Sequence, residues 1–152
     1  MVLKEKERAA IEDLQSQEKT CIEKYAKYAE QAKDSVLKDL FRTLQQEEQK
    51  HYQSLGQVLN GTVPDSDCND SDGANYNPTA SYDAMSNSED KQFDCFLATD
   101  CIGTEKLVSS EYNTDVFVFN NSKLRKLLAD IQIEEQNHAE MLWKYKTANG
   151  MA

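Results

Sequence analysis

The sequence contains one polar pattern twice, and this repeat limits the folds open to the chain. Glu47-Glu48-Gln49-Lys50-His51 recurs as Glu134-Glu135-Gln136-Asn137-His138, at an offset of 87 residues, and the protein's two histidines end these stretches. The same offset joins further pairs: Glu18 and Glu105, Tyr25 and Tyr112, Ser35 and Ser122, Leu40 and Leu127, Leu55 and Leu142. A repeat of this length predicts two copies of one supersecondary unit, packed with approximate two-fold symmetry.

Both stretches lie in segments whose apolar residues recur every three or four positions, the period of an amphipathic helix. The stripe around the first stretch is Leu37, Leu40, Leu44, Glu48, His51, Leu55 and Val58. The stripe around the second is Leu124, Leu127, Ile131, Glu135, His138, Leu142 and Tyr145. Similar stripes carry Glu18 and Glu105 in the preceding segments. We therefore predict an all-α chain with helices at about 4–33, 35–60, 88–119 and 122–148.

Short turns separate the helices within each copy, which predicts two antiparallel hairpins. Ser35 is a candidate N-cap for the second helix, and Asn60-Gly61 supplies its end. Residues 61–87 are rich in Pro, Gly, Asn and Asp. Such a segment is either a linker between domains or a crossover between hairpins. We favour the crossover in a four-helix bundle, because neither hairpin could bury its apolar stripe alone.

Length and charge fit one soluble domain over residues 1–152. The formal net charge of -10 argues against nucleic acid or an anionic membrane as a partner. No apolar run approaches the ~20 residues that span a bilayer. The charged N-terminus lacks the apolar region of a secretory signal, so a cytoplasmic location is expected.

The four cysteines give no sign of a zinc or rubredoxin-type site, because none of them forms a CxxC pair. A cytoplasmic location predicts that the thiols are reduced. Cys21 and Cys101 fall on apolar stripes, and we expect both in the core.

The repeated polar residues are predicted to meet at one level. Glu18 lies about 16 residues before the centre of its turn, and Glu48 and His51 lie about 14 and 17 after it, so their heights agree within roughly one helical turn. The same arithmetic holds for the second set: Glu105, Glu135 and His138. Four carboxylates and two imidazoles would therefore face one another inside the protein. Buried carboxylates at such distances cannot all stay ionised without cations.

Two divalent metal ions would balance this ligand set. Carboxylate and imidazole suit iron or manganese, with zinc as a further candidate, and iron is our first expectation. Glu47 and Glu134 are alternative ligands one position earlier. They lie off the apolar stripes, so we favour Glu48 and Glu135. A Glu from each of two helices and Glu-x-x-His from the other two is the ligand set of di-iron and di-manganese carboxylate bundles.

On these residues the chain resembles ferritin-like di-metal carboxylate proteins of the rubrerythrin and ferritin kind, across all four helices. Its second half is similar to the Coat F family of spore coat proteins. That likeness rests on Thr104-Glu105-Lys106, Glu111-Tyr112-Asn113-Thr114, Leu124-Arg125 and Glu134-Glu135-Gln136-Asn137-His138-Ala139-Glu140. The chain departs from coat relatives in ending Asn149-Gly150-Met151-Ala152, without an aromatic tail, and from full rubrerythrins in lacking the rubredoxin cysteines.

The ferritin-like resemblance implies that Glu48 and Glu135 bridge two metals. It implies terminal ligation by Glu18, Glu105, His51 and His138. It implies peroxidase, catalase or ferroxidase chemistry on peroxide, oxygen or ferrous iron, with Tyr25 and Tyr112 beside the ligands as radical-quenching candidates. Core packing with a satisfied hydroxyl is the alternative role for both tyrosines.

The Coat F resemblance implies a different role. It points to a spore coat location, with other coat proteins or a second copy of the chain as partners. The metal site would then stabilise the bundle or be a vestige of an older activity.

Overall fold

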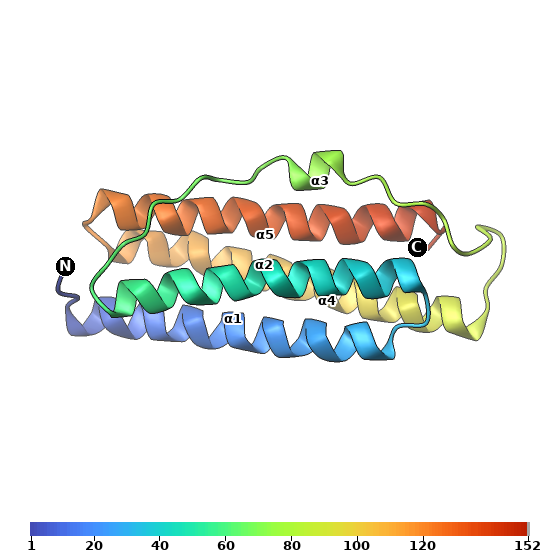
Figure 1. Cartoon of the computed structure of the whole chain (residues 1–152), viewed down its shortest axis with the longest axis horizontal. Coiled ribbons are helices and arrows are strands. Elements are labelled where there is room, and N and C mark those ends of the chain that lie inside the picture. The colour runs from blue at the N-terminus through green and yellow to red at the C-terminus, as the bar shows by residue number, and fades with distance from the viewer. Residues whose placement is uncertain (152) are drawn as a thin grey trace.

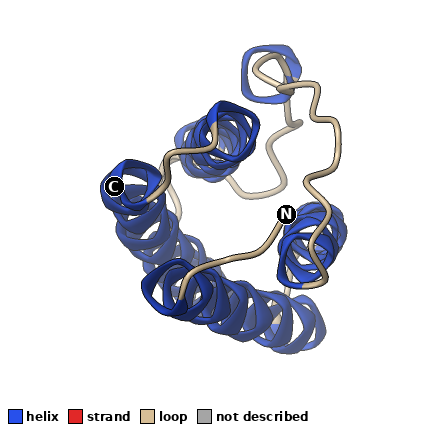
Figure 2. Ribbon diagram, turned by 90° about the vertical axis from the view of Figure 1, so that its left-hand side faces the viewer, coloured by secondary structure: helices blue, strands red, loops and turns tan. Residues whose placement is uncertain are grey.

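The computed structural model describes residues 1–151, and within this range all regular structure is helical (Figure 1). Four long helices lie side by side and surround a common centre when seen nearly end-on (Figure 2): α1 (Glu5–Gln31), α2 (Ser35–Leu59), α4 (Glu89–Asp115) and α5 (Ser122–Ala148). The short helix α3 (Asp72–Asn75) and the 3-10 turn η1 (Val116–Val118) lie between them. The predicted all-α class is confirmed.

The long helices pair as two hairpins, α1 with α2 and α4 with α5, and the most extensive helix contacts lie within these pairs. The chain between α2 and α4 runs back along α5 for the length of the molecule (Figure 1). This is the path predicted for the crossover at 61–87. The hairpins therefore face each other across one core.

The start of α2 corrects one prediction. Asp34, not Ser35, caps this helix, since its side chain accepts a hydrogen bond from the Val36 amide at 3.1 Å. Ser35 is instead the first helical residue. The equivalent cap of α5 is Asn121, which accepts from the Leu124 amide at 2.9 Å. Asp and Ser are both favourable caps, so two neighbouring candidates could not be separated by residue type.

The end of α4 corrects a second prediction. The helix predicted to reach residue 119 stops at Asp115, and Val116–Val118 form a 3-10 turn. Phe119 follows in an extended conformation and is buried against the apolar core. Alternating Val and Phe are weak helix formers, which explains the tightening of this last turn. The other ends lie within two residues of their predicted limits.

The crossover is more ordered than its composition suggested, because side chains on one face of α5 hold it. Asn137 accepts a hydrogen bond from the Gly73 amide at 2.8 Å and donates one to the Asn69 carbonyl at 3.0 Å. Lys144 donates to the Gly73 carbonyl at 2.6 Å. A Cβ on Gly73 would lie 2.7 Å from the Asn137 side-chain oxygen. Glycine thus permits α3 to approach α5 this closely.

Apolar residues fill the core in two clusters, and the predicted polar residues lie between them along α2, α4 and α5. One cluster includes Phe41, Leu44, Leu97, Cys101 and Leu142. The other includes Leu14, Cys21, Leu55, Val108 and Leu128. Both cysteines predicted for the core are buried. The polar residues are thereby isolated from water at mid-height.

Candidate metal centre

The structure brings all six predicted residues together in the interior. Glu18 comes from α1, Glu48 and His51 from α2, Glu105 from α4, and Glu135 and His138 from α5. The six side chains belong to residues that are at most 4% exposed. Because α2 and α5 each give a Glu and a His three residues apart, one turn of each helix aims both groups inward.

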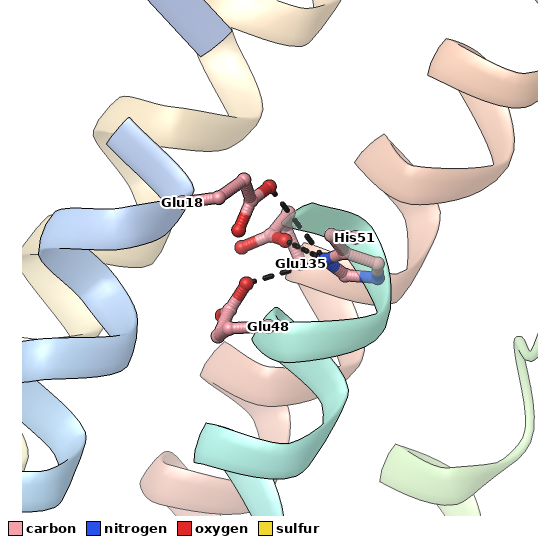
Figure 3. A group of neighbouring side chains, drawn as sticks. All are labelled: Glu18, Glu48, His51 and Glu135. Atoms are coloured by element: carbon pink, nitrogen blue, oxygen red, sulfur yellow. Dashed lines mark hydrogen bonds and ion pairs between the residues drawn. The ribbon is translucent and has the colours of Figure 1, made fainter. Parts of the chain in front are cut away.

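These residues form two overlapping groups, each with four ligand atoms within 4.8 Å of one another. The first group is Glu18, Glu48, His51 and Glu135, and Figure 3 shows these side chains converging from three helices. The second is Glu48, Glu105, Glu135 and His138. Glu48 and Glu135 therefore belong to both groups, while each of the other residues belongs to one.

Both imidazoles turn the same nitrogen toward the carboxylates. His51 Nδ1 lies 2.8 Å from Glu135 Oε1 and 3.2 Å from Glu48 Oε2. His138 Nδ1 lies 3.0 Å from Glu48 Oε1 and 3.5 Å from Glu105 Oε1. The rings stack with centroids 5.8 Å apart. The two halves thus present matching ligand atoms to one shared space.

Burial of several like charges shifts the acid–base equilibria of the cluster. Burial, followed by repulsion from Glu48, raises the pKa of Glu18 to about 8. Burial and then repulsion from Glu105 raise the pKa of Glu135 well above its ordinary value. Burial alone would lower the pKa of His138, but attraction from Glu105 and Glu48 raises it to about 10. Without a cation, the cluster must hold extra protons to limit its negative charge.

Several carboxylate oxygens in this cluster have no hydrogen-bond partner. They are Glu18 Oε2, Glu105 Oε2 and both oxygens of Glu135. Glu135 Oε1 is close to His51 Nδ1, but the contact lacks hydrogen-bond geometry. Unpartnered buried acceptors cost free energy, and a divalent cation would satisfy both their charge and their lone pairs. The residues present therefore fit a pair of divalent metal ions.

The two predicted tyrosines contact the cluster directly, and each reaches across to the other hairpin. The Tyr25 hydroxyl donates to Glu105, and the Tyr112 hydroxyl donates to Glu18. Burial and the nearby carboxylates raise the pKa of both hydroxyls well above the ordinary value. Both tyrosines consequently remain protonated donors that hold one oxygen of a glutamate in place.

Glu134 has a contact that the sequence did not indicate. Its Oε2 lies 2.6 Å from His51 Nε2, on the side of the ring away from the cluster. Its other oxygen accepts from the Asn69 amide in the crossover at 3.3 Å. Glu47, its counterpart in the repeat, instead pairs with Lys50 at 2.7 Å. Both glutamates flank a stripe in the same way, so periodicity could not distinguish them.

We expect Glu134→Gln to weaken metal binding at one of the two groups. A carboxylate on the outer nitrogen fixes ring orientation and raises the basicity of the inner nitrogen, and its loss costs about 10–100-fold in affinity. Calorimetric titration of the metal-free protein with Mn(II) measures both affinities. Glu47→Gln is the matched control and should leave both unchanged. Equal affinities in wild type and Glu134→Gln would contradict the assignment.

Comparison with known proteins gives one family match. Residues 94–152 match the family model described as Coat F domain. The match covers α5 and most of α4, with Glu105, Glu135 and His138, and supports the resemblance seen in the second half of the sequence. Searches of curated proteins and of solved structures gave no match. None of the helices within residues 1–151 has the length and apolar character needed to cross a membrane.

Proposed function

We propose that this chain is a spore coat component that binds two divalent metal ions between its hairpins. The Coat F match over α4 and α5 supports the coat assignment. The observation that carries metal binding is the buried six-residue cluster with two overlapping groups of four ligand atoms. In the coat the protein would contact other coat proteins or a second copy of itself.

The ferritin-like relation is part of this proposal. Two helical hairpins, one long crossover and a Glu plus a Glu-x-x-His from each hairpin support it. Within this arrangement Glu48 and Glu135 would bridge the metals, because each belongs to both groups. The carboxylate-rich set favours iron, with manganese or zinc as alternatives.

Metal binding would stabilise the folded chain, because the unfolded chain does not assemble the six ligands. A bound ion adds about 4 kcal/mol to the free energy of unfolding when free metal exceeds the dissociation constant about 1,000-fold. Tyr25 and Tyr112 would orient Glu105 and Glu18 by their hydrogen bonds. The apolar clusters on either side would shield the ligands from water along the length of the bundle.

A second candidate function is oxidoreductase chemistry on peroxide or oxygen at the same centre. The specific observation in its favour is that buried tyrosine hydroxyls touch ligands in both hairpins. A metal pair would supply redox chemistry, and tyrosines this close could donate an electron and a proton to quench a radical. The same residues would also serve a structural metal site, so a measurement of activity must distinguish the two functions.

Metal analysis combined with a peroxide assay tests both functions. We expect the purified protein, or metal-free protein given Fe(II) or Mn(II), to hold two ions per chain, one for each group of four ligand atoms. Protein that neither binds these metals nor gains melting temperature would contradict the proposal. Peroxide consumption above that of Glu48→Ala would favour the oxidoreductase. Metal binding with no excess consumption would favour a structural coat site.

A further inference from the structure

We infer that a cavity between α4 and α5 is a port through which a small uncharged polar molecule, of the size of hydrogen peroxide, reaches the ligand cluster. The cavity has a volume of about 440 Å³, and its lining includes Glu105 and Glu135 together with exposed Asn113. It therefore leads from the surface to two residues of the ligand cluster that are almost fully buried. This inference rests on the proposed metal centre and adds a route and a ligand class to it.

Unsatisfied hydrogen-bond acceptors lie behind the inner end of the cavity. Glu105 and Glu135 line it, and three of their four carboxylate oxygens have no hydrogen-bond partner. These oxygens are themselves closed off from water, so a molecule entering from the surface would reach them when the side chains of the cluster shift. The port thus leads toward carboxylate oxygens of the site that lack hydrogen-bond partners.

The walls of the port are polar but mostly uncharged. Gln136 donates to Gln132 at 2.7 Å, and Gln132 donates to the Ser109 hydroxyl at 2.8 Å. This chain of amides and a hydroxyl offers both donors and acceptors, which suits a small neutral hydrogen-bonding molecule. Lys106 is the one cationic side chain in the lining, and it disfavours passage of metal cations.

The first hairpin provides an internal comparison, because the repeat places different residues at the same positions. Ile22 stands where the second hairpin has Ser109, and Tyr52 stands where it has Ala139. Both substitutions add apolar bulk at positions that line the port in the second hairpin. Replacing these port residues by their counterparts from the first hairpin should therefore fill the opening with side chains that the same fold already accommodates at equivalent positions.

A second cavity, of about 270 Å³ beneath the crossover, reaches His51 and offers the competing route. Its lining has five carboxylates: Glu47, Asp65, Asp67, Asp130 and Glu134. The lining also includes Lys50, but five carboxylates still leave an excess of negative charge, which attracts cations rather than neutral molecules. Because the lining of the second cavity is more negative than that of the α4–α5 cavity, we assign neutral ligands to the α4–α5 cavity. Residues of the second cavity provide control variants.

The test measures the binding of nitric oxide, a small neutral ligand of Fe(II), by anaerobic stopped-flow absorption on the iron-loaded chain of residues 1–152. We expect Ser109→Ile and Ala139→Tyr each to slow nitric oxide association about tenfold, with iron content unchanged. Asp67→Asn, in the second cavity, should associate at the wild-type rate. Two filling variants are used because one of them could fail to fold, which circular dichroism would reveal.

The outcomes separate the port from the metal centre. Absence of Fe(II) binding by wild type would overturn both the proposed function and the port. Normal iron content with unchanged nitric oxide rates in the folded filling variants would overturn the port alone. Slower iron uptake with unchanged nitric oxide association would show that the cavity conducts cations, and would also overturn the port as stated.

Discussion

A Glu48→Ala variant is expected to lose both metal ions, whereas His51→Ala loses one. Glu48 belongs to both groups of ligand atoms, and His51 belongs only to the group with Glu18. Loss of both ions should lower the melting temperature of the metal-loaded protein by about 16–32 °C, from about 4 kcal/mol of linkage for each ion and about 2–4 °C per kcal/mol. Metal analysis after gel filtration gives the stoichiometry, and scanning calorimetry gives the melting temperature.

Glu47→Ala is the control for this pair, since it removes a carboxylate one position from Glu48. Glu47 pairs with Lys50 near the surface and belongs to neither ligand group. The variant should retain both ions and the melting temperature of the loaded wild type. Two ions in Glu48→Ala, or a loss in Glu47→Ala, would show that the wrong glutamate has been assigned.

The second large effect is expected from Asp94→Ala, which should reduce the free energy of unfolding by roughly 3 kcal/mol. Asp94 is fully buried and accepts hydrogen bonds from the amides of Lys33 and Asp34, at 2.8 and 2.9 Å, and from the Tyr82 hydroxyl at 2.7 Å. Alanine would leave these donors without their acceptor, and the Asp34 amide among them is buried. Urea denaturation of the metal-free protein measures the loss without interference from metal binding.

Asp90→Ala serves as the control, because Asp90 lies one turn earlier on α4 and is exposed. We expect its free energy of unfolding to stay within about 0.5 kcal/mol of wild type. If Asp94→Ala were as mild, the anchoring of the α1–α2 turn to α4 would contribute little to stability. The two variants together separate the buried network from the general effect of removing a charge.

The four helices and the convergence of the six polar residues could be predicted from the repeat. Each apolar stripe, with its polar residues, occurs once in each half of the sequence. Glu48 and His51 stand on a core stripe, and their counterparts stand on another, so helical period alone places them inward. The role of Asp94 could not be predicted in this way. Its acceptor atoms serve backbone amides about 60 residues earlier in the chain, and such contacts leave no periodic pattern in the sequence.

The contact of Glu134 and the short helix α3 escaped prediction for related reasons. Glu134 differs from Glu47 only in the tertiary neighbours that each meets, His51 in one case and Lys50 in the other. Residues 72–75 form a single turn whose position depends on contacts with Asn137 and Lys144 of α5. Features fixed by distant partners become visible only when the chain is folded.

The crossed hydrogen bonds of Tyr25 to Glu105 and of Tyr112 to Glu18 make the centre a product of hairpin docking. Neither hairpin supplies the tyrosine that holds its own glutamate, and each brings three of the six predicted ligands. Separate hairpins would have to assemble the site by a bimolecular encounter. The crossover converts this encounter into an intramolecular one, with an effective concentration on the order of millimolar. Linking the halves in one chain thus lets the site form at any protein concentration.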